Sequence, residues 1–289
     1  MPDRPGVPPS LAGVVLAAGA GTRLAPLTSL RPKALCPVGG VALLDLALDR
    51  LRGTLAGDGP DQLAVNAHHH AGQVLAHVGD RAHVGVEQPR ALGTAGALGA
   101  LRDWIGGRAV LLTNADAYLP GGLDLPAGLD LPGGRPFADG WDGERCRLAV
   151  VPAGGARADF RLPDGTGVRY VGGALLPWRL VRDLAATPSG LYEVMWAAEA
   201  GRGALDLQLI AGEAVDCGTV GDYLRANLLA SGGASVVGAG ADVRGRLTRA
   251  VVWDGARVEP HEHLVDVVRA AGDGAVLTVG SAAAGPGRR

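Results

Sequence analysis

Residues 16–35 read LAAGAGTRLAPLTSLRPKAL and combine a glycine turn with two nearby cations. Gly19 and Gly21 end an apolar run, and glycines let backbone N–H groups approach an anion closely. Arg23 follows the turn directly, and Lys33 comes after a short proline-rich stretch. Lys33 is the one lysine of the chain, because arginine supplies the rest of its 27 basic residues. These residue types predict a small, local site for a phosphate-bearing ligand.

Two common phosphate motifs can be tested against this stretch. A P-loop requires G-x-x-x-x-G-K-[ST], whereas Lys33 lies between Pro32 and Ala34. The dinucleotide fingerprint G-x-G-x-x-G requires glycine at position 24, which is Leu24. A NAD-dependent oxidoreductase is therefore disfavoured, also because no clear acidic residue closes the second predicted strand. A nucleoside triphosphate site of another kind is favoured.

The retention of a single lysine is informative about the chemistry. Arginine grips phosphate oxygens with a planar fork, whereas lysine is a compact point charge on a flexible stem. A site that requires the compact charge of lysine cannot simply accept arginine. A solvated surface lysine is the ordinary alternative, but in this chain other basic positions have become arginine. We therefore interpret Lys33 as functional.

Composition limits the class of protein. The chain has 289 residues, 47% hydrophobic and 19% charged, with a net charge of −2, so no broad basic face indicates a nucleic-acid partner. Its three cysteines form no C-x-x-C pair, which argues against a disulfide scaffold or structural zinc site. No signal-peptide core or membrane-length apolar run is present. We expect a reduced, cytoplasmic protein with no membrane partner.

The elements that would position the site alternate along the chain. Apolar runs predict strands over 11–21, 62–67, 82–88 and 108–116, and helical spacing predicts helices over 41–55, 71–79 and 94–106. In the helix over 41–55 the arginines are expected on the far side from the apolar residues. Further strands are predicted over 146–153 and 168–177, and a helix over 221–231. The stretch 119–143 is too rich in proline and glycine for either. This alternation predicts a mostly parallel α/β sheet.

The residues after Gly232 and Gly233 change character. Val237 and Val243 are six apart, and Val252, Val258 and Leu264 repeat that spacing. Such a period, with glycines nearby, is typical of hexapeptide coils in a left-handed parallel β-helix. A pair of β-hairpins capping the main domain is the alternative. We predict a domain over 1–232 and a short β-helical tail over 233–289.

The stretch LAAGAGTRLAPLTSLRPKALCPVGG resembles the signature of the sugar-1-phosphate nucleotidyltransferases, the NDP-sugar pyrophosphorylases. The resemblance spans about 25 positions, including the glycines, Arg23 and Lys33. It implies a Rossmann-like nucleotidyltransferase domain and a reaction in which an NTP and a sugar 1-phosphate give an NDP-sugar and pyrophosphate, with Mg²⁺. It also implies that Arg23 contacts the triphosphate and that Lys33 reaches the phosphate where bonds change.

The resemblance continues downstream and assigns further roles. EQPRALGTAGAL (87–98) resembles the element that holds the base, while LLTNADAYL (111–119) and AVDCGTVGDYLRAN (214–227) resemble elements that carry Mg²⁺-binding aspartates. The histidines of LAVNAHHHAGQV are expected at the cleft or its rim rather than on a metal. The implied metal ligands are Asp116 and Asp216, and the implied nucleotide-binding residues are Ala17, Ala18, Gly19, Gly21, Thr22, Gln88, Gly93 and Thr94.

One departure concerns the sugar phosphate. Many members of the family bind it with the lysine of an E-K-P element, and this chain has no second lysine. Its equivalent region, RADFRLPDGTGVRYVGGALLP, resembles the MurNAc-1-phosphate uridylyltransferase branch, whereas LGTAGAL and the tail resemble mannose-1-phosphate guanylyltransferases. Arg161 is a candidate for the missing charge, although its side chain could equally face solvent. Gly172, Gly173 and Glu193 are the other candidates for contacts to the sugar.

These patterns predict a sugar-1-phosphate nucleotidyltransferase. The tail is too short for the acetyltransferase half of some relatives, so no acyl transfer is expected, and it is a candidate for contacts in a homo-oligomer. The rival interpretation is a catalytically silent regulatory protein that binds a nucleotide sugar. The presence of Arg23, Lys33, Asp116 and Asp216 together favours the enzyme.

Overall fold

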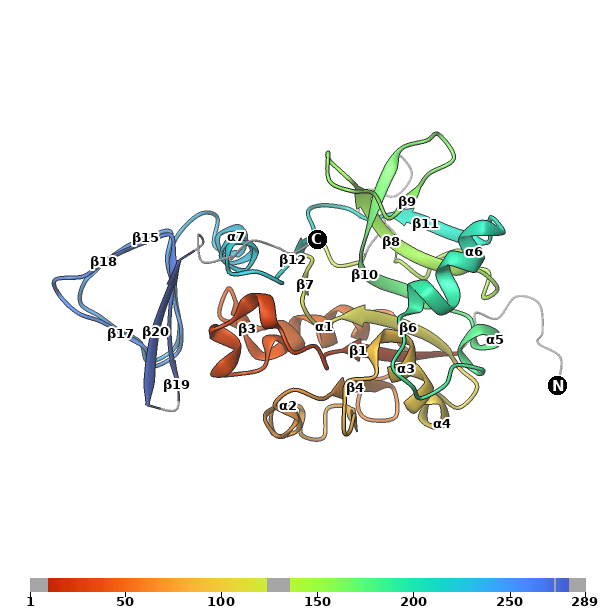
Figure 1. Cartoon of the computed structure of the whole chain (residues 1–289), viewed down its shortest axis with the longest axis horizontal. Coiled ribbons are helices and arrows are strands. Elements are labelled where there is room, and N and C mark those ends of the chain that lie inside the picture. Colours follow the sequence, from red (N-terminus) through yellow and green to blue (C-terminus); the bar gives the residue numbers. More distant parts are fainter. Residues whose placement is uncertain (1–9, 124–135, 273, 281–289) are drawn as a thin grey trace.

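A computed structural model describes residues 10–123, 136–272 and 274–280. Its centre is a mixed sheet in the strand order β11-β8-β10-β6-β1-β4-β5, with β9 paired to β10 (Figure 1). β1, β4, β5 and β6 run parallel to one another, and β10 runs antiparallel between β6 and β8. The strands are β1 (Leu11–Leu16), β4 (Leu63–Ala67), β5 (His83–Val86), β6 (Ala109–Asn114), β8 (Cys146–Pro152), β9 (Phe160–Arg161), β10 (Gly167–Leu176) and β11 (Leu205–Leu209). The predicted α/β fold is confirmed, and the stretch 119–143 lies partly outside the described residues.

Alternating strand residues supply the two faces of this sheet with apolar side chains. Val15 and Leu111 point into one cluster, whereas their neighbours Val14 and Leu112 point into the other. The first face is covered by α1 (Leu43–Arg52) and α2 (Ala71–Val78). The second is covered by α3 (Gly93–Ala100), α4 (Arg102–Ile105), α5 (Trp178–Val181) and a π-helical turn (Tyr192–Trp196), which α6 (Ala197–Gly201) follows directly. The helix expected over 94–106 is therefore two helices, which meet at Leu101.

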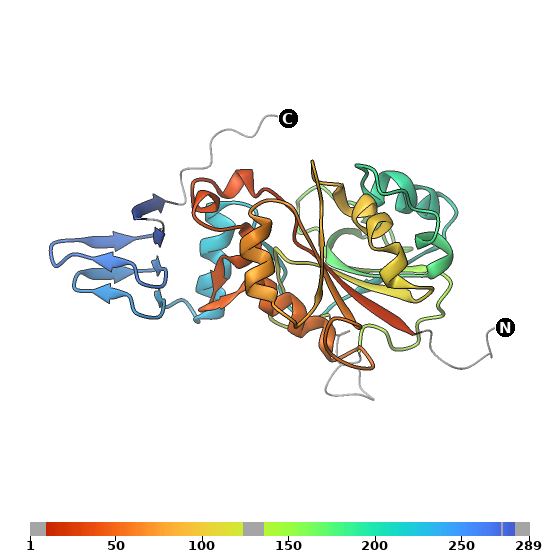
Figure 2. The same cartoon turned by 90° about the horizontal axis from the view of Figure 1, so that it is seen from below.

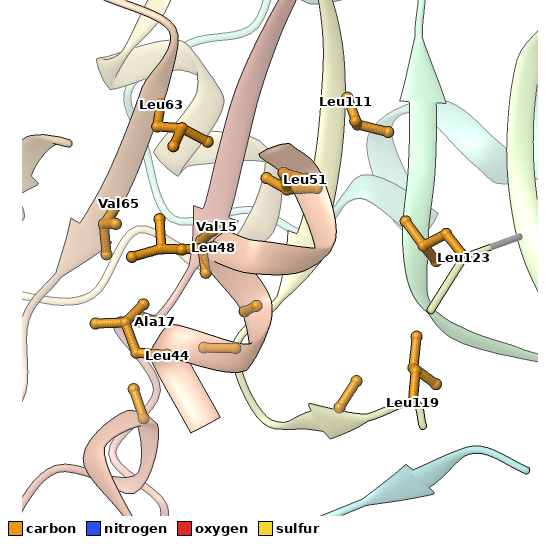
Figure 3. Packing of buried hydrophobic residues seen from close by; sticks show 14 of the residues in the cluster. Val15, Ala17, Leu44, Leu48, Leu51, Leu63, Val65, Leu111, Leu119 and Leu123 are labelled. Atoms are coloured by element: carbon orange, nitrogen blue, oxygen red, sulfur yellow. The ribbon is translucent and has the colours of Figure 1, made fainter. Parts of the chain in front are cut away.

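The packing of α1 shows how its sequence specifies this contact. Leu44, Leu48 and Leu51 recur at helical spacing and are completely buried (Figure 3). They pack with Val15 of β1 and Val65 of β4 in the same cluster. Each such leucine contributes about 1.5–3 kcal/mol through burial. This contact fixes the helix against the strands whose ends carry the site.

The polar ends of the central strands converge at one edge of the sheet. Because β1, β4 and β6 are parallel, the residues that follow them, including Ala17, His68 and Asp116, lie at the same edge. β10 approaches from the opposite direction, with Gly173 paired to Thr113 of β6. Its first residues therefore extend past the carboxyl end of β6. The topology brings segments far apart in the sequence to one place.

The tail lies at one end of the molecule, beyond α7 (Val220–Ala230), as Figure 2 shows. Its short strands pair in parallel ladders, β13-β16-β19, β14-β17 and β15-β18, which agrees with the predicted β-helix-like coils. Val252, Val258 and Leu264 are buried inside it, whereas Val237 is exposed. A hairpin formed by β19 and β20 follows the coils, so the alternative prediction of β-hairpins describes this part of the tail. The strands are β13 (Val236–Val237), β14 (Asp242–Val243), β15 (Arg246–Thr248), β16 (Val251–Val252), β17 (Arg257–Val258), β18 (His263–Val265), β19 (Val267–Gly272) and β20 (Ala275–Gly280).

The tail is joined to the loop that carries Lys33. Trp253 is completely buried, and its Nε1 donates a hydrogen bond to Tyr223 Oη at 3.0 Å. Tyr223 in turn donates to the carbonyl of Pro37. The guanidinium carbon of Arg31 lies 4.2 Å from the centre of the Trp253 ring, a cation–π contact. The loop therefore packs on the tail as well as on the sheet.

Within the described ranges, no helix combines the length and hydrophobicity that a membrane span requires.

Candidate active site

Four charged side chains meet at the edge of the sheet. Lys33 Nζ lies 2.6 Å from Asp116 Oδ2 and 3.4 Å from Asp216 Oδ1. Arg23 Nη2 lies 3.4 Å from the other oxygen of Asp216, Oδ2. The Lys33 side chain is only 8% exposed, while those of Arg23 and Asp216 are more than half exposed. The structure thus gathers the two predicted catalytic residues and the two predicted metal ligands into one cluster.

A small antiparallel pair of strands places the two aspartates. β7 (Ala117–Tyr118) pairs with β12 (Val215–Asp216), so Asp216 lies opposite Ala117, and Cys217 N donates to the Asp116 carbonyl at 3.0 Å. Cys217 itself points inward and is completely buried. Burial raises the pKa of its thiol to about 12, so the thiol stays neutral beside the carboxylates. The pairing therefore presents both carboxylates on the open side.

The glycine turn is packed directly against the lysine. Gly21 has a φ of 61°, in the left-handed region that favours glycine. A Cβ at this position would lie 2.8 Å from Thr28 Cγ2 and 3.0 Å from Lys33 Cβ. Thr28 Oγ1 also donates to the Gly21 carbonyl at 3.2 Å. The absence of a side chain at position 21 thus lets the lysine stem pass beneath the turn.

Arg50 is a component that the sequence interpretation placed wrongly on the outer side of its helix. Its Nη1 donates to Thr113 Oγ1 at 2.7 Å, and its Nη2 donates to the Ala117 carbonyl at 2.6 Å. Burial lowers its pKa to about 10, with Asp116 opposing the shift. The long side chain reaches from α1 to the carboxyl end of β6, which helical periodicity alone does not indicate. Arg50 therefore stabilises the backbone on both sides of Asp116.

A pocket of about 210 Å³ opens next to the cluster. It is bounded by residues of the glycine turn, β4, α3 and the end of β6: Leu16, Ala18, Gly19, Asn66, Ala91, Gly93, Thr94, Asn114 and Asp116. Four predicted nucleotide-binding residues, Ala18, Gly19, Gly93 and Thr94, are among them. Ala17 lies beneath the turn, whereas Gly21, Thr22 and Gln88 do not line the pocket, and Gln88 is exposed. This pocket is large enough for a nucleobase and part of a ribose.

A buried pair of polar side chains, which sequence reasoning missed, fixes the walls of this pocket. Asn66 Oδ1 accepts a hydrogen bond from Ala17 N at 2.7 Å, and Asn66 Nδ2 donates to Glu87 Oε1 at 2.7 Å. The other oxygen of Glu87 accepts from Leu92 N at 2.7 Å. Three segments are thereby tied together through two buried side chains. The sequence signal that could have indicated these two residues is their position, because Asn66 lies near the end of β4 and Glu87 directly follows β5.

A second pocket of about 170 Å³ lies on the other side of the aspartates. Its walls come from the ends of β6, β7, β10 and β12: Asn114, Asp116, Ala117, Leu119, Arg169, Tyr170, Val171, Gly172, Ala214, Val215 and Asp216. Gly172, with a φ of 85°, lies at the irregularity in β10 where pairing with β8 shifts register. A Cβ on Gly173 would overlap the Leu123 side chain, so that side of the strand is filled by protein. Gly172 is thus at the site and Gly173 only supports it.

A third pocket, of about 270 Å³, joins the other two around Asn114. Tyr170, Tyr192, Glu193 and Trp196 are among its lining residues. The buried atoms Tyr170 Oη and Trp196 Nε1 have no hydrogen-bond partner among the described residues. The candidate Glu193 lines this pocket. Arg161 does not: it donates to the Gly165 carbonyl at 2.9 Å and lines a separate pocket next to β11.

The donor set of the cluster suits a hard divalent cation. Oxygens of Asp116 and Asp216 both approach the same Lys33 Nζ, so the two carboxylates converge on one region. Mg²⁺ commonly uses one or two carboxylates together with substrate phosphates and water. No group of three or more His, Cys, Asp or Glu side chains suited to a metal occurs in the described part of the chain, and this includes the adjacent histidines 68–70. The two aspartates therefore fit a metal that is completed by substrate.

Comparison with known proteins agrees with the sequence motifs and the fold. Residues 12–123 match the nucleotidyl transferase family. N-acetylmuramate alpha-1-phosphate uridylyltransferase of Caulobacter vibrioides is 38% identical over 48% of this chain, and the match spans 57% of that relative's length. A Bacillus anthracis structure assigned as a glucose-1-phosphate thymidylyltransferase covers 76% of this chain and 95% of its own, with a TM-score of 0.59 and 20% identity, which shows a shared fold. The resemblance expected from the sequence motifs is confirmed.

Proposed function

Since the chain resembles the sugar-1-phosphate nucleotidyltransferases, we propose that it joins a nucleoside triphosphate to a sugar 1-phosphate and releases pyrophosphate. The main support is the convergence of Lys33, Asp116 and Asp216 from three separate elements at the junction of two pockets. One pocket accepts a nucleoside and the other adjoins the reacting phosphates. A folded regulatory copy has no need to retain this charge cluster.

In the proposed step an oxygen of the sugar 1-phosphate attacks the α-phosphorus of the NTP. The new P–O bond forms as the bond from the α-phosphorus to the bridging oxygen of the β-phosphate breaks, so pyrophosphate leaves. Such transfers require positioning and charge neutralisation more than covalent chemistry from the protein. Lys33, held between two carboxylates, would direct its ammonium at the α-phosphate, and the exposed Arg23 guanidinium would bind the departing phosphates.

Asp116 and Asp216 would hold Mg²⁺. When bound, this cation supplies positive charge that neutralises phosphate oxygens. The carboxylates also orient Lys33, because its ammonium is within hydrogen-bond distance of both. The cytoplasm is the compartment we propose, since nucleotides are available there and the three cysteines are free.

The nucleotide would bind against the glycine turn and the start of α3. Ala18, Gly19 and Gly93 offer backbone at the pocket wall, and α3 directs its N-terminus there. Thr94 Oγ1 accepts from Leu191 N at 2.8 Å, so it joins this wall to the segment that lines the third pocket. Gly21 and Thr22 would act from the turn, and Gln88 from the rim.

The sugar would occupy the third pocket. Tyr170 and Trp196 give it aromatic walls, and Glu193 adds a carboxylate for sugar hydroxyls. Of the two branches that the sequence resembles, we favour the uridylyltransferase branch, because the C. vibrioides relative belongs to it. We propose a domain over 1–232 and a tail over 233–289, with the tail as a surface for contact between subunits.

The test is pyrophosphate release by the wild-type chain with Mg²⁺ across a matrix of NTPs and sugar 1-phosphates. We expect one pair to give stoichiometric pyrophosphate and NDP-sugar, and chelation of divalent cations to stop the reaction. Nucleotide binding without pyrophosphate from any pair would support the regulatory alternative instead.

A further inference from the structure

Arg169 of β10 lies in the second pocket together with both aspartates. It pairs in the sheet with Val151, and the alternate residue Val171 belongs to the same apolar cluster as Val151. Residues directly opposite each other, and residues two apart along a strand, share a face. The Arg169 side chain therefore lies on the face of the sheet that the pocket residues Leu119 and Ala214 occupy. Tyr170 faces the other way.

The Arg169 guanidinium has no hydrogen bond or ion pair to any residue within 10–123, 136–272 or 274–280. The other cations of the site all have partners. Lys33 and Arg23 contact the aspartates, and Arg50 donates to a hydroxyl and two carbonyls. Arg169 is nevertheless half-buried. A half-buried guanidinium with five unused donors is suited to an anion supplied from outside.

The charge of the site leads to the same conclusion. Arg23 and Lys33 carry two positive charges, and Asp116 and Asp216 carry two negative ones, so the cluster alone is neutral. The proposed reaction brings a triphosphate and a second phosphate together there. Repulsion between these anions has to be offset by further positive charge. A metal at the aspartates supplies part of it, and Arg169 is the cation left on the side opposite the nucleotide pocket.

We propose that Arg169 binds the phosphate of the sugar 1-phosphate and so replaces the lysine that the chain lacks. This inference rests on the proposed function and assigns a residue to its second substrate. Gly172 also lines this pocket, and because it carries no side chain, β10 passes close to Asn114 and Ala117 there. The fork of the guanidinium can donate hydrogen bonds to two phosphate oxygens at once. The sugar ring would then extend from Arg169 past Tyr170 into the third pocket.

The sequence indicated Arg161 as a candidate for this role, so the test compares the two arginines directly. Arg161 lies on β9, is exposed, and donates to the carbonyl of Gly165. The test compares Arg169→Gln, Arg169→Lys and Arg161→Gln with the wild type in pyrophosphate release. Arg246→Gln, which changes an exposed arginine of the tail, serves as the matched control. The KM for the sugar 1-phosphate and the KM for the NTP are measured separately, with the pair that the wild type turns over.

We expect Arg169→Gln to raise the KM for the sugar 1-phosphate about tenfold or more, because charge-assisted hydrogen bonds are lost. The KM for the NTP should change less than about twofold, and Arg169→Lys should recover part of the loss by restoring the charge. Arg161→Gln and Arg246→Gln should resemble the wild type. The effect should be equal for sugars with and without a carboxylate substituent, because the phosphate is common to both.

Three results would overturn the assignment while leaving the proposed function intact. The first is an unchanged KM for the sugar 1-phosphate in Arg169→Gln. The second is an increase in the KM for the sugar 1-phosphate in Arg161→Gln instead of in Arg169→Gln. The third is an effect confined to carboxylated sugars, which would assign Arg169 to the sugar substituent. Failure of the proposed function is a different result, because the wild type would then release no pyrophosphate with any pair.

Discussion

Lys33 Nζ lies 2.6 Å from Asp116 Oδ2, although 83 positions separate the two residues along the chain. The lysine side chain is 8% exposed and the aspartate side chain 37%, so the pair is open on the carboxylate side only. A partly buried ammonium is stable there because a second carboxylate, that of Asp216, lies within 3.4 Å. The ion pair therefore holds Lys33 against Asp116, which lines both pockets.

The buried link between Asn66 and Glu87 predicts a defect in nucleotide binding. In Asn66→Leu, Ala17 N loses its acceptor and the Glu87 carboxylate loses a donor. Leaving buried polar groups without partners costs about 1–3 kcal/mol each, so both stability and the shape of the glycine turn should change. We expect the KM for the NTP to rise about tenfold, with the KM for the sugar 1-phosphate changed much less.

Steady-state kinetics and thermal unfolding of Asn66→Leu test this, with Gln73→Ala, an exposed amide on α2, as the control. A variant that binds nucleotide like the wild type would show that the link does not shape the pocket.

The contact between Trp253 and the loop that carries Lys33 predicts that the tail influences turnover. Trp253→Phe keeps an aromatic ring but removes the hydrogen bond to Tyr223 and weakens the contact with Arg31. We expect a loss of about 1–2 kcal/mol in unfolding free energy and a lower kcat, because the loop that carries Lys33 is less firmly held. Val265→Ala, at an exposed position of β18, should have little effect.

Denaturant unfolding and pyrophosphate release measured on the same samples test this coupling. Wild-type values for both in Trp253→Phe would mean that the tail does not position the loop.

The three buried thiols predict a loss of stability in alkaline solution. Burial is the main cause that raises the pKa values of Cys36, Cys146 and Cys217 from 9.0 to about 12. The unfolded chain releases these protons near pH 9, whereas the folded chain holds them until about pH 12. Their stabilisation is complete below pH 9 and is lost as the pH rises towards 12, at about 1.4 kcal/mol per pH unit for each thiol.

Urea unfolding of the wild type and Cys217→Val at about pH 8 and about pH 10.5 measures one thiol's share of this loss. The variant should lose less stability between the two pH values than the wild type. Equal losses would contradict the raised pKa of Cys217.

Much of the architecture could be predicted from local pattern. An apolar run that ends in glycines gave β1, an apolar run with a polar end gave β6, and helical spacing gave α1, because each pattern reflects one face of a sheet or helix. The period of six residues indicated the parallel coils of the tail, whose buried positions include Val252 and Val258. The sequence pattern did not distinguish the hairpin β19-β20 from these coils, because the hairpin residues are also largely apolar and β-branched.

The site could be predicted only where a continuous motif carried it. Arg23 and Lys33 belong to one stretch, and the resemblance supplied Asp116 and Asp216, which meet only through the pairing of β7 with β12. Arg50 was missed because its role depends on the reach of a long side chain across the sheet edge.

Arg169 was missed for a related reason. Its importance follows from strand alternation and from the absence of a partner among the described residues, neither of which a motif records. Arg161 was a candidate because it lies in the region equivalent to the E-K-P element, although its side chain could equally face solvent, and in the structure it lines a separate pocket.

The central claim is that Lys33 acts as a point charge on the reacting phosphate, held in place by Asp116 and Asp216. Pyrophosphate release by Lys33→Arg, compared with the wild type at saturating substrates, tests it most directly. The guanidinium keeps the charge but is a larger planar group than the ammonium that lies 2.6 Å from Asp116 and 3.4 Å from Asp216, so we expect kcat to fall about 100-fold or more while nucleotide binding is retained. Turnover close to that of the wild type would contradict the account.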